Sequence, residues 1–204
     1  MQEFNLNELE ISAISEIANI SMGNAATSIS LLVQREVNIS TPKLAICDNG
    51  SSIDAAADKQ VVASVDYVKG IMGRNMLFLL EDEAKMMADF MMGSDGHGMF
   101  FDMEFSDMHL SAISEVMNQA MGAAATAMGL MLDRVVDIST PDARKIEAGQ
   151  SISFDSNKDT RFVQVTFEVY IGDSMTLRMA QAFPFLLAKA IADIFLIKKG
   201  TMDK

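Results

Sequence analysis

The sequence of 204 residues is poor in the side chains that most often carry chemistry alone. Its single cysteine, Cys47, can form no internal disulfide, which is typical of a reducing compartment. Its two histidines, His97 and His109, have no partner at metal-ligand spacing, so we expect no zinc or iron site. A cysteine nucleophile beside one of these histidines is a disfavoured alternative. Any chemistry should therefore depend on carboxylates, amides and hydroxyls.

Other absences narrow the class of protein further. No apolar run reaches the roughly 18 residues of a membrane span, and the acidic start MQEFNLNELE does not resemble a signal peptide. The glycines form no phosphate-binding loop of the GxGxxG or GxxxxGK[ST] type. The net charge is −12, and the longest basic cluster is Lys198-Lys199. We expect a cytoplasmic protein with no nucleic-acid partner and no direct membrane insertion.

What the sequence does contain is a repeat. Residues 12–42 align with residues 111–141 without a gap, and 18 of the 31 positions are identical. Half of the residues are apolar, as in a globular protein. We therefore predict a single domain over residues 1–204, built from two repeats and a linker, at about 6–93, 106–197 and 94–105.

Each repeat has the same predicted plan. A long helix opens it, at about residues 6–34 and again at about 107–133, with caps at Asn5 (followed by Glu8) and at Ser106. Short β segments and a hairpin follow, and a second helix closes the repeat. Val163, Val165, Phe167 and Val169 alternate with polar residues, as in a half-buried strand. The predicted fold is α/β (α+β), with one mainly antiparallel sheet and the helices packed over it.

Each long helix carries a narrow polar stripe. At 100° per residue, Ser12, Glu16 and Asn19 fall within about 60° of arc. Ser111, Glu115 and Asn118 repeat this arrangement. Asparagine is unfavourable inside a helix because its amide competes for backbone hydrogen bonds. A solvated face would explain one such stripe, but two in the same register favour a function.

Small and sulfur-containing residues have structural explanations. Gly23, Ala25 and Ala26, matched by Gly122, Ala124 and Ala125, are expected to let two helix backbones approach closely. The run MMADFMM at 86–92 is expected to face the core, with adaptable recognition by methionine as the alternative. His97 is expected in a loop and His109 at a helix cap.

A carboxylate and an amide on a helix surface can complete a reaction whose reactive group comes from another molecule. Amide side chains position water in phosphoryl transfer, where catalysis is mostly placement and electrostatics. A partner that brings a phosphoryl group, Mg²⁺ and a lysine would need an oriented water and a docking contact.

The spacing [D/S]-x3-E-x2-N-x22-P resembles the signature of the CheC, FliY and CheX family of CheY-P phosphatases of bacterial chemotaxis. The chain matches this spacing twice, first at Ser12, Glu16, Asn19 and Pro42, and then at Ser111, Glu115, Asn118 and Pro141. Within the family, the surrounding segments NISMGNAATSIS and HLSAISEVMNQAMG are most similar to FliY. The resemblance implies hydrolysis of the aspartyl phosphate of CheY. It also implies a six-stranded sheet with two motif helices side by side and two shorter helices.

The resemblance assigns roles to the motif residues. Asn19 and Asn118 would orient the water, and Glu16 and Glu115 would meet a lysine of CheY and help to dock it. The two serines and two prolines would support the motif. No cofactor or metal of its own is implied, because the Mg²⁺ belongs to CheY. CheD and flagellar motor switch proteins are further implied partners, which places the protein at the cytoplasmic face of the motor.

The chain departs from the family pattern in two ways. Glycine often precedes the motif asparagine, but here Ala18 and Met117 do, and Met117 is expected to crowd the second site. We find neither the N-terminal CheY-binding peptide nor the C-terminal rotor-ring domain of FliY, so a free-standing CheC-like protein and a FliY middle domain stay open. The alternative function is a non-catalytic flagellar-switch scaffold that binds CheY-P, since FliM shares the fold but lacks the E-x-x-N pairs.

Overall fold

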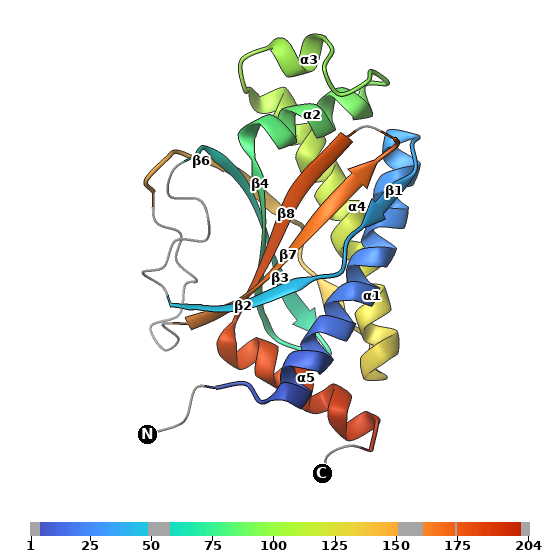
Figure 1. Ribbon diagram of the computed structural model, residues 1–204, viewed down its shortest axis with the longest axis vertical. Helices are drawn as coiled ribbons and strands as arrows, with labels where there is room; N and C mark the ends of the chain where they lie inside the picture. The colour runs from blue at the N-terminus through green and yellow to red at the C-terminus, as the bar shows by residue number, and fades with distance from the viewer. Residues whose placement is uncertain (1–4, 49–57, 151–160, 174, 201–204) are drawn as a thin grey trace.

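The computed structural model describes residues 5–48, 58–150, 161–173 and 175–200 (Figure 1). The helices are α1 (Glu8–Val33), α2 (Glu81–Met91), α3 (Met99–Asp102), α4 (Asp107–Leu132) and α5 (Phe185–Lys198). The strands are β1 (Val37–Ile39), β2 (Lys43–Asp48), β3 (Gln60–Lys69), β4 (Gly73–Leu80), β5 (Asp137–Ile138), β6 (Asp142–Ile146), β7 (Arg161–Ile171) and β8 (Met175–Pro184). The predicted mixed fold with a mainly antiparallel sheet is confirmed.

The strands form one sheet in the order β1-β7-β8-β4-β3-β5, and every described pair is antiparallel. Strand β2 also pairs with β7, and β6 also pairs with β3. The sheet therefore has eight strands in six positions, because each edge position is occupied by two successive short strands. The six-stranded sheet that the resemblance implies thus corresponds to these six positions, with the strand at each edge divided in two.

The two edge breaks have the same construction. Pro42 separates β1 from β2, and Pro141 separates β5 from β6. Proline has no backbone N–H to give to the ladder, so the edge strand is interrupted there. Two residues earlier, Ser40 and Ser139 carry the pairing across the break: their hydroxyls accept the backbone N–H of Glu168 and of Asp66, both at 3.0 Å.

Helices α1 and α4 lie side by side over one face of the sheet and run in opposite directions (Figure 1). Helix α2 lies near one end of this pair and α5 near the other (Figure 1). The main core fills the space between helices and sheet, and the alternating residues of β7, Val163, Val165, Phe167 and Val169, are buried in it as predicted. The opposite face of the sheet carries a smaller apolar cluster that includes Phe78.

The start of α1 differs from the prediction by two residues. Its N-cap is Asn7, not Asn5, and the partner is Glu10, not Glu8. Asn7 Oδ1 accepts the Glu10 N–H at 2.9 Å, and Glu10 Oε2 accepts the Asn7 N–H at 2.8 Å. Glu10 is also buried and paired with Lys189, whereas Glu8 is exposed. Tertiary contact therefore selects the second of two similar capping signals.

Helix α4 begins after Ser106 as predicted, and His109 is its capping residue. His109 Nδ1 accepts the Ser106 N–H at 3.1 Å, and Nε2 lies 2.7 Å from the Phe100 carbonyl oxygen. Since Nδ1 is an acceptor, Nε2 carries the proton and donates it to that carbonyl. Both imidazole nitrogens are thus engaged inside the fold.

The segment between the repeats contains the short helix α3, which the sequence did not suggest. The carboxylate of Asp89, fully buried at the end of α2, accepts the backbone N–H groups of Gly96, Gly98 and Phe100 at 2.9–3.2 Å. Burial raises the pKa of Asp89, but the hydrogen bonds outweigh it and hold the pKa below its usual value. The division of the chain into two repeats of one domain stays a prediction, although helices and strands follow in the same order in both halves.

Candidate functional site

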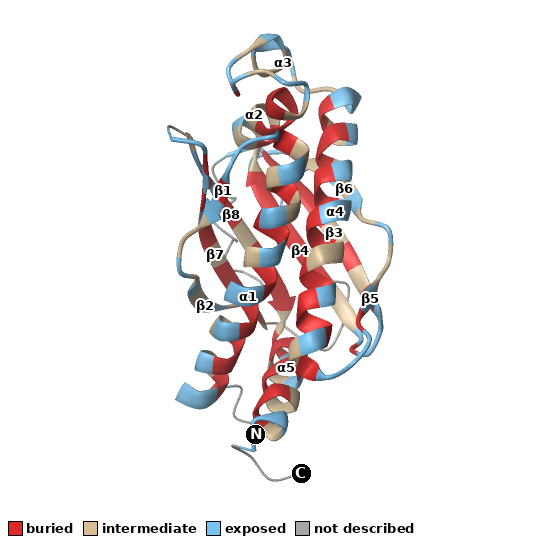
Figure 2. Cartoon of the chain, turned by 90° about the vertical axis from the view of Figure 1, so that its right-hand side faces the viewer, coloured by how far each residue is buried: buried red, intermediate tan, exposed pale blue. Residues whose placement is uncertain are grey.

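The predicted polar stripes lie on the outer surface of the helix pair. Ser12, Glu16 and Asn19 on α1 are all exposed, and so are Ser111, Glu115 and Asn118 on α4. The opposite sides of the two helices are buried in the core, through residues such as Ile14, Ile17, Ile113 and Val116. Figure 2 shows exposed residues recurring along the outside of both helices. The structure thus presents two copies of one polar stripe on neighbouring helices.

The two motif glutamates have different partners. Lys199, just beyond α5, places Nζ 2.8 and 2.7 Å from the two carboxylate oxygens of Glu16. Glu115 instead accepts a hydrogen bond from Gln119 Nε2 at 3.0 Å. The carboxylate on α1 is therefore paired with a cation, whereas the carboxylate on α4 accepts a hydrogen bond from a neutral amide.

Both members of the Glu16–Lys199 ion pair are solvent-accessible, with 43 % of the glutamate side chain and 48 % of the lysine side chain exposed. An ion pair of this exposure contributes about 0–1 kcal/mol to stability. Lys199 also lies 4.6 Å from the centre of the Phe195 ring, which helps to hold its ammonium group over α1. This contact can be displaced by a competing cation at small cost.

Neither partner is among the residues predicted from the sequence, and the reasons differ. Gln119 could have been found, because it lies four residues after Glu115 on the same helix face, where side chains meet. Lys199 could not, because it is 183 residues away from Glu16. Only the packing of α5 against α1 brings it there.

The expectation that Met117 crowds the second site is wrong. Met117 is fully buried, whereas its neighbour Asn118 is exposed. On a helix, adjacent residues point about 100° apart, so a large side chain can enter the core without covering the next residue. The corresponding Ala18 on α1 is also buried. Nothing about residue 117 therefore disfavours the site on α4.

The expectation for the small residues is half right. Ala25, Ala26, Ala124 and Ala125 are buried in the main core, where α1 packs on α4. The two glycines do not contribute to this packing. A Cβ atom placed on Gly23 or on Gly122 would meet nothing within 4 Å.

The two motif prolines lie in the sheet edges and not on the helix stripes. Pro42 and Pro141 are partly buried at the two breaks described above. The strands just before them, β1 and β5, pack against α1 and α4 respectively. Their position fits support of the fold beneath each motif helix and no contact with a substrate.

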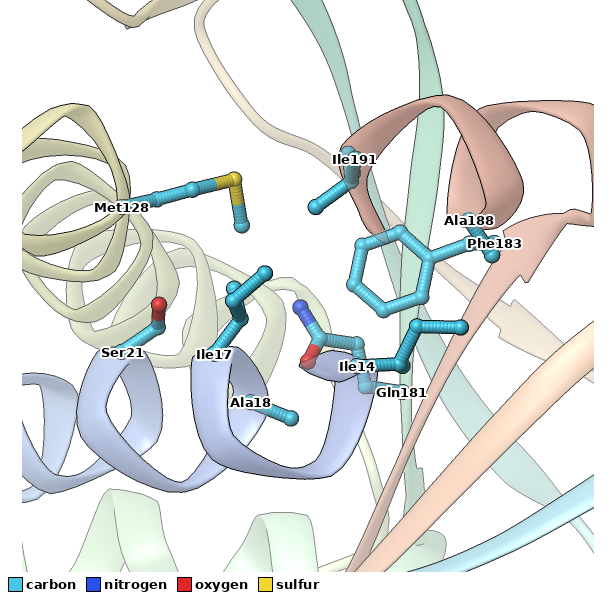
Figure 3. Close-up of a pocket in the computed structure, with 9 residues that line it drawn as sticks. All are labelled: Ile14, Ile17, Ala18, Ser21, Met128, Gln181, Phe183, Ala188 and Ile191. Atoms are coloured by element: carbon cyan, nitrogen blue, oxygen red, sulfur yellow. The ribbon is translucent and has the colours of Figure 1, made fainter. Parts of the chain in front are cut away.

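Hollows in the structure do not coincide with the stripes. A crevice of about 10 Å³ between α1, α4, α5 and β8 is lined mainly by apolar side chains, with Ser21 and Gln181 among them (Figure 3). Its volume suffices for about one water molecule. A wider open hollow of about 460 Å³ lies at the C-terminal end of α4, around Leu130 and Arg134. Neither hollow is lined by a motif residue, so we place the candidate site on the helix surface.

The described part of the chain holds no group of three or more His, Cys, Asp or Glu side chains that is arranged to hold a metal ion. Cys47 lies on β2. The ring nitrogens of His109 bond Ser106 and Phe100. The ring of His97 packs edge-on against that of Phe101, with 4.9 Å between the ring centres. Among these same residues, no helix has the length and apolar character to cross a bilayer.

The chain is a mixed α/β protein with one polar stripe on each of two neighbouring helices, and comparisons identify its family. The model of the CheC-like family matches residues 9–46 and 108–143, which include both stripes. FliY of Thermotoga maritima, a solved structure, is 30 % identical with a TM-score of 0.86, over 95 % of this chain and 98 % of that one. The chain belongs to the CheC-like family.

Two relatives known by sequence are matched over only part of their length. The flagellar motor switch phosphatase FliY of Bacillus subtilis is 35 % identical over 185 residues, which are 90 % of this chain and 48 % of that protein. CheC1 of Halobacterium salinarum is 30 % identical over 137 residues, 64 % of this chain and 66 % of that one. The chain thus spans about half of the first relative and just under two thirds of the second.

More distant structures share only the fold. FliM in a FliG–FliM complex of Helicobacter pylori has a TM-score of 0.72 at 14 % identity, over 92 % of this chain and 100 % of that one. A CheX–CheY complex with BeF₃ and Mg²⁺ from Borrelia burgdorferi gives a TM-score of 0.53 at 16 % identity, over 80 % and 94 %. The same architecture therefore occurs in proteins of different names, and function has to be argued from the site.

Proposed function

We propose that the chain is a phosphatase that hydrolyses the aspartyl phosphate of the response regulator CheY. The observation that carries the proposal is the pair of exposed Ser-Glu-Asn stripes, in identical register on the adjacent helices α1 and α4. The family supports it, because a relative that matches 90 % of the chain is a flagellar motor switch phosphatase. A fold-level relative has also been crystallised with CheY.

The proposed chemistry needs little from the enzyme itself. A water molecule attacks phosphorus in line, a new O–P bond forms, and the bond between phosphorus and the aspartyl oxygen breaks. The products are inorganic phosphate and the free carboxylate of CheY. The Mg²⁺ that neutralises phosphoryl charge in such reactions belongs to CheY.

In this proposal Asn19 and Asn118 orient the attacking water through their side-chain amides. Glu16 and Glu115 dock CheY by pairing with a cationic group near its phosphorylation site. Ser12 and Ser111 lie one turn before the glutamates and complete the polar contact surface. Pro42 and Pro141 hold the sheet edges under the helices. These roles are the ones that the family resemblance implies, and the exposed positions on the stripes and the breaks in the sheet support them.

The test is phosphate release from Mg²⁺-loaded CheY charged with acetyl phosphate. We expect the wild-type chain to accelerate release, and the double variant Asn19→Ala/Asn118→Ala to lose that acceleration while its circular dichroism stays unchanged. Undiminished acceleration by a folded double variant would refute the assigned site. Binding of phosphorylated CheY without acceleration would instead establish the scaffold alternative.

The partners beyond CheY follow from the relatives. The resemblance to FliY and the shared fold with FliM favour association with the flagellar motor switch, and we propose that location for the chain. Co-purification with switch proteins, compared between wild type and a variant with altered stripes, would test it. Binding of CheD stays a prediction from the family resemblance.

A further inference from the structure

Two glycines lie on the stripes themselves. Gly23 and Gly122 each come four residues after the motif asparagine, at the same register in both repeats. With Ser12 at 0° on the α1 helical wheel, Gly23 falls at 20°, between Glu16 at 40° and Asn19 at −20°. Each glycine therefore continues the stripe by one further turn. Their carbonyl oxygens accept hydrogen bonds from Thr27 and Thr126, at 3.1 and 2.9 Å.

Nothing inside the molecule requires these glycines. Glycine is among the least favourable residues in a helix interior, and it is usually kept there for close packing or for a left-handed backbone. Neither Gly23 nor Gly122 has a positive φ, and a Cβ on either would meet nothing within 4 Å. Gly129 on α4 shows the contrast, since a Cβ there would lie 2.6 Å from the Arg134 carbonyl oxygen.

The neighbouring positions show that the two stripes were free to change. Residue 20 is isoleucine on α1, whereas its counterpart Gln119 on α4 is polar. Residue 24 is asparagine, whereas its counterpart is Ala123. The glycine between these positions is the same in both helices although it weakens each of them. A reason outside the chain is therefore needed.

The short side chain of the motif asparagine gives a reason for keeping the glycine one turn away. For the amide of Asn19 to hold a water at the phosphoryl group, the backbone of α1 must come very close to CheY. A side chain one turn further along the same stripe would hold the helix away. We infer that Gly23 and Gly122 are clearance positions, where the loop that carries the aspartyl phosphate of CheY packs directly on the bare helix backbone.

The inference rests on the proposed function and adds specificity-determining positions to it. Its test is the double variant Gly23→Ala/Gly122→Ala in the full chain. Both substitutions favour the helix and clash with nothing, so each should raise Tm by about 2–4 °C. At the same time kcat/KM for phosphorylated CheY should fall between about 10- and 100-fold, because the methyl groups displace the partner. A more stable but less active enzyme is a result that a structural role cannot give.

Two controls accompany the double variant. Asn24→Ala changes the adjacent exposed residue, about 120° away from Ser12, to the residue that the other repeat has at Ala123. It should raise Tm modestly and leave kcat/KM unchanged. Gly129→Ala should lower Tm, which shows that stabilisation by alanine is specific to glycines without a packing role.

The outcomes separate this inference from the proposed function. Acceleration by the wild type, with full activity in the glycine double variant, overturns the clearance positions and leaves the phosphatase intact. If the wild type does not accelerate phosphate release, the proposed function fails. The Kd for CheY charged with beryllofluoride then decides the inference alone: a Kd about tenfold weaker in the glycine variant supports it, and an unchanged Kd refutes it.

Discussion

Helices α1 and α4 carry the same outer stripe but are anchored by different chemistry. The third helical residue is Glu10 in one and His109 in the other, and both are buried. Each accepts the backbone N–H of its N-cap, Asn7 or Ser106. Glu10 completes its bonding with Lys189 of α5, whereas His109 donates to a main-chain carbonyl. The third helical residue thus caps the N-terminus in both helices, but it is a glutamate in α1 and a histidine in α4.

The same divergence reaches the surface. Glu16 lies against Lys199, but Glu115 lies against the neutral Gln119. The four stripe residues, serine, glutamate, asparagine and glycine, are identical in both helices. The stripe residues are the same on both helices, but the groups that contact their glutamates differ. The two candidate sites therefore share a geometry and differ in electrostatics. We expect the site on α1 to be the weaker one, because its docking carboxylate already has an internal cation.

The largest effect expected from this comparison concerns the buried capping residues Glu10 and His109, here called the anchors of α1 and α4. His109→Ala removes the hydrogen bonds of the imidazole to Ser106 and Phe100 and leaves a cavity, so we expect the free energy of unfolding to fall by about 3 kcal/mol. Glu10→Ala should cost only about 1–2 kcal/mol, because Lys189 is 39 % exposed and can be solvated when its partner is lost. Urea unfolding at neutral pH measures both values.

His97→Ala is the matched control for the anchor variants. It removes the other histidine, which is exposed in the loop after α2, and should change stability by less than about 0.5 kcal/mol. Equal losses for His109→Ala and Glu10→Ala would show that the two anchors are equivalent in energy as well as in geometry.

The next effect concerns Lys199. In an Asn118→Ala background, in which only the α1 site remains, Lys199→Met should free Glu16 for the partner. We expect the KM for phosphorylated CheY to fall about fivefold, equivalent to about 1 kcal/mol, with kcat unchanged. Steady-state phosphate release at low salt measures it, because salt screens an exposed pair.

Lys198→Met is the control, since it removes the same charge one residue away. Lys198 bonds the Leu130 carbonyl oxygen and is not a partner of Glu16 in any described contact. The same KM change in both lysine variants would mean that net charge, and not the Glu16 pair, limits docking. Greater residual activity in Asn118→Ala than in Asn19→Ala would reverse the predicted order of the sites.

The smallest effect is a pH dependence that only the α1 anchor should show. The hydrogen bond to Glu10 raises the pKa of Lys189, with the charges of Asp193 and Glu10 adding to it and burial opposing it. A raised pKa in the folded state contributes stability that is present below the unfolded pKa, near 10.5, and is lost as the pH rises through the folded pKa. The contribution should be on the order of 0.5–1 kcal/mol, because Lys189 is partly exposed.

Urea unfolding of wild type and Lys189→Met, from about pH 8 to about pH 11, tests this dependence. The wild-type advantage should shrink towards the alkaline end. Burial also raises the pKa of Tyr67, and its ionisation destabilises both proteins alike, so only the difference between them is informative. A constant difference over the whole range would show that the Glu10 pair adds no stability.

The sequence predicted most of what the repeat and the residue periodicity encode. The strand alternation around Phe167 and the exposed stripes depend on local spacing, and the structure agrees with them. The start of α1 and the partner of Glu16 depend on segments far away in the chain, and the open space around Gly23 becomes visible only once the helices are packed. Propensity cannot choose between Asn5 and Asn7 as caps when a buried contact with α5 decides.

The proline breaks have a consequence for how copies of the chain meet each other. A sheet edge with a long straight row of free N–H and C=O groups invites another strand to pair with it. At both edges described here, the outermost strands are two to six residues long and are bent at Pro42 or Pro141. Edge-to-edge polymerisation is thereby discouraged at both ends of the sheet.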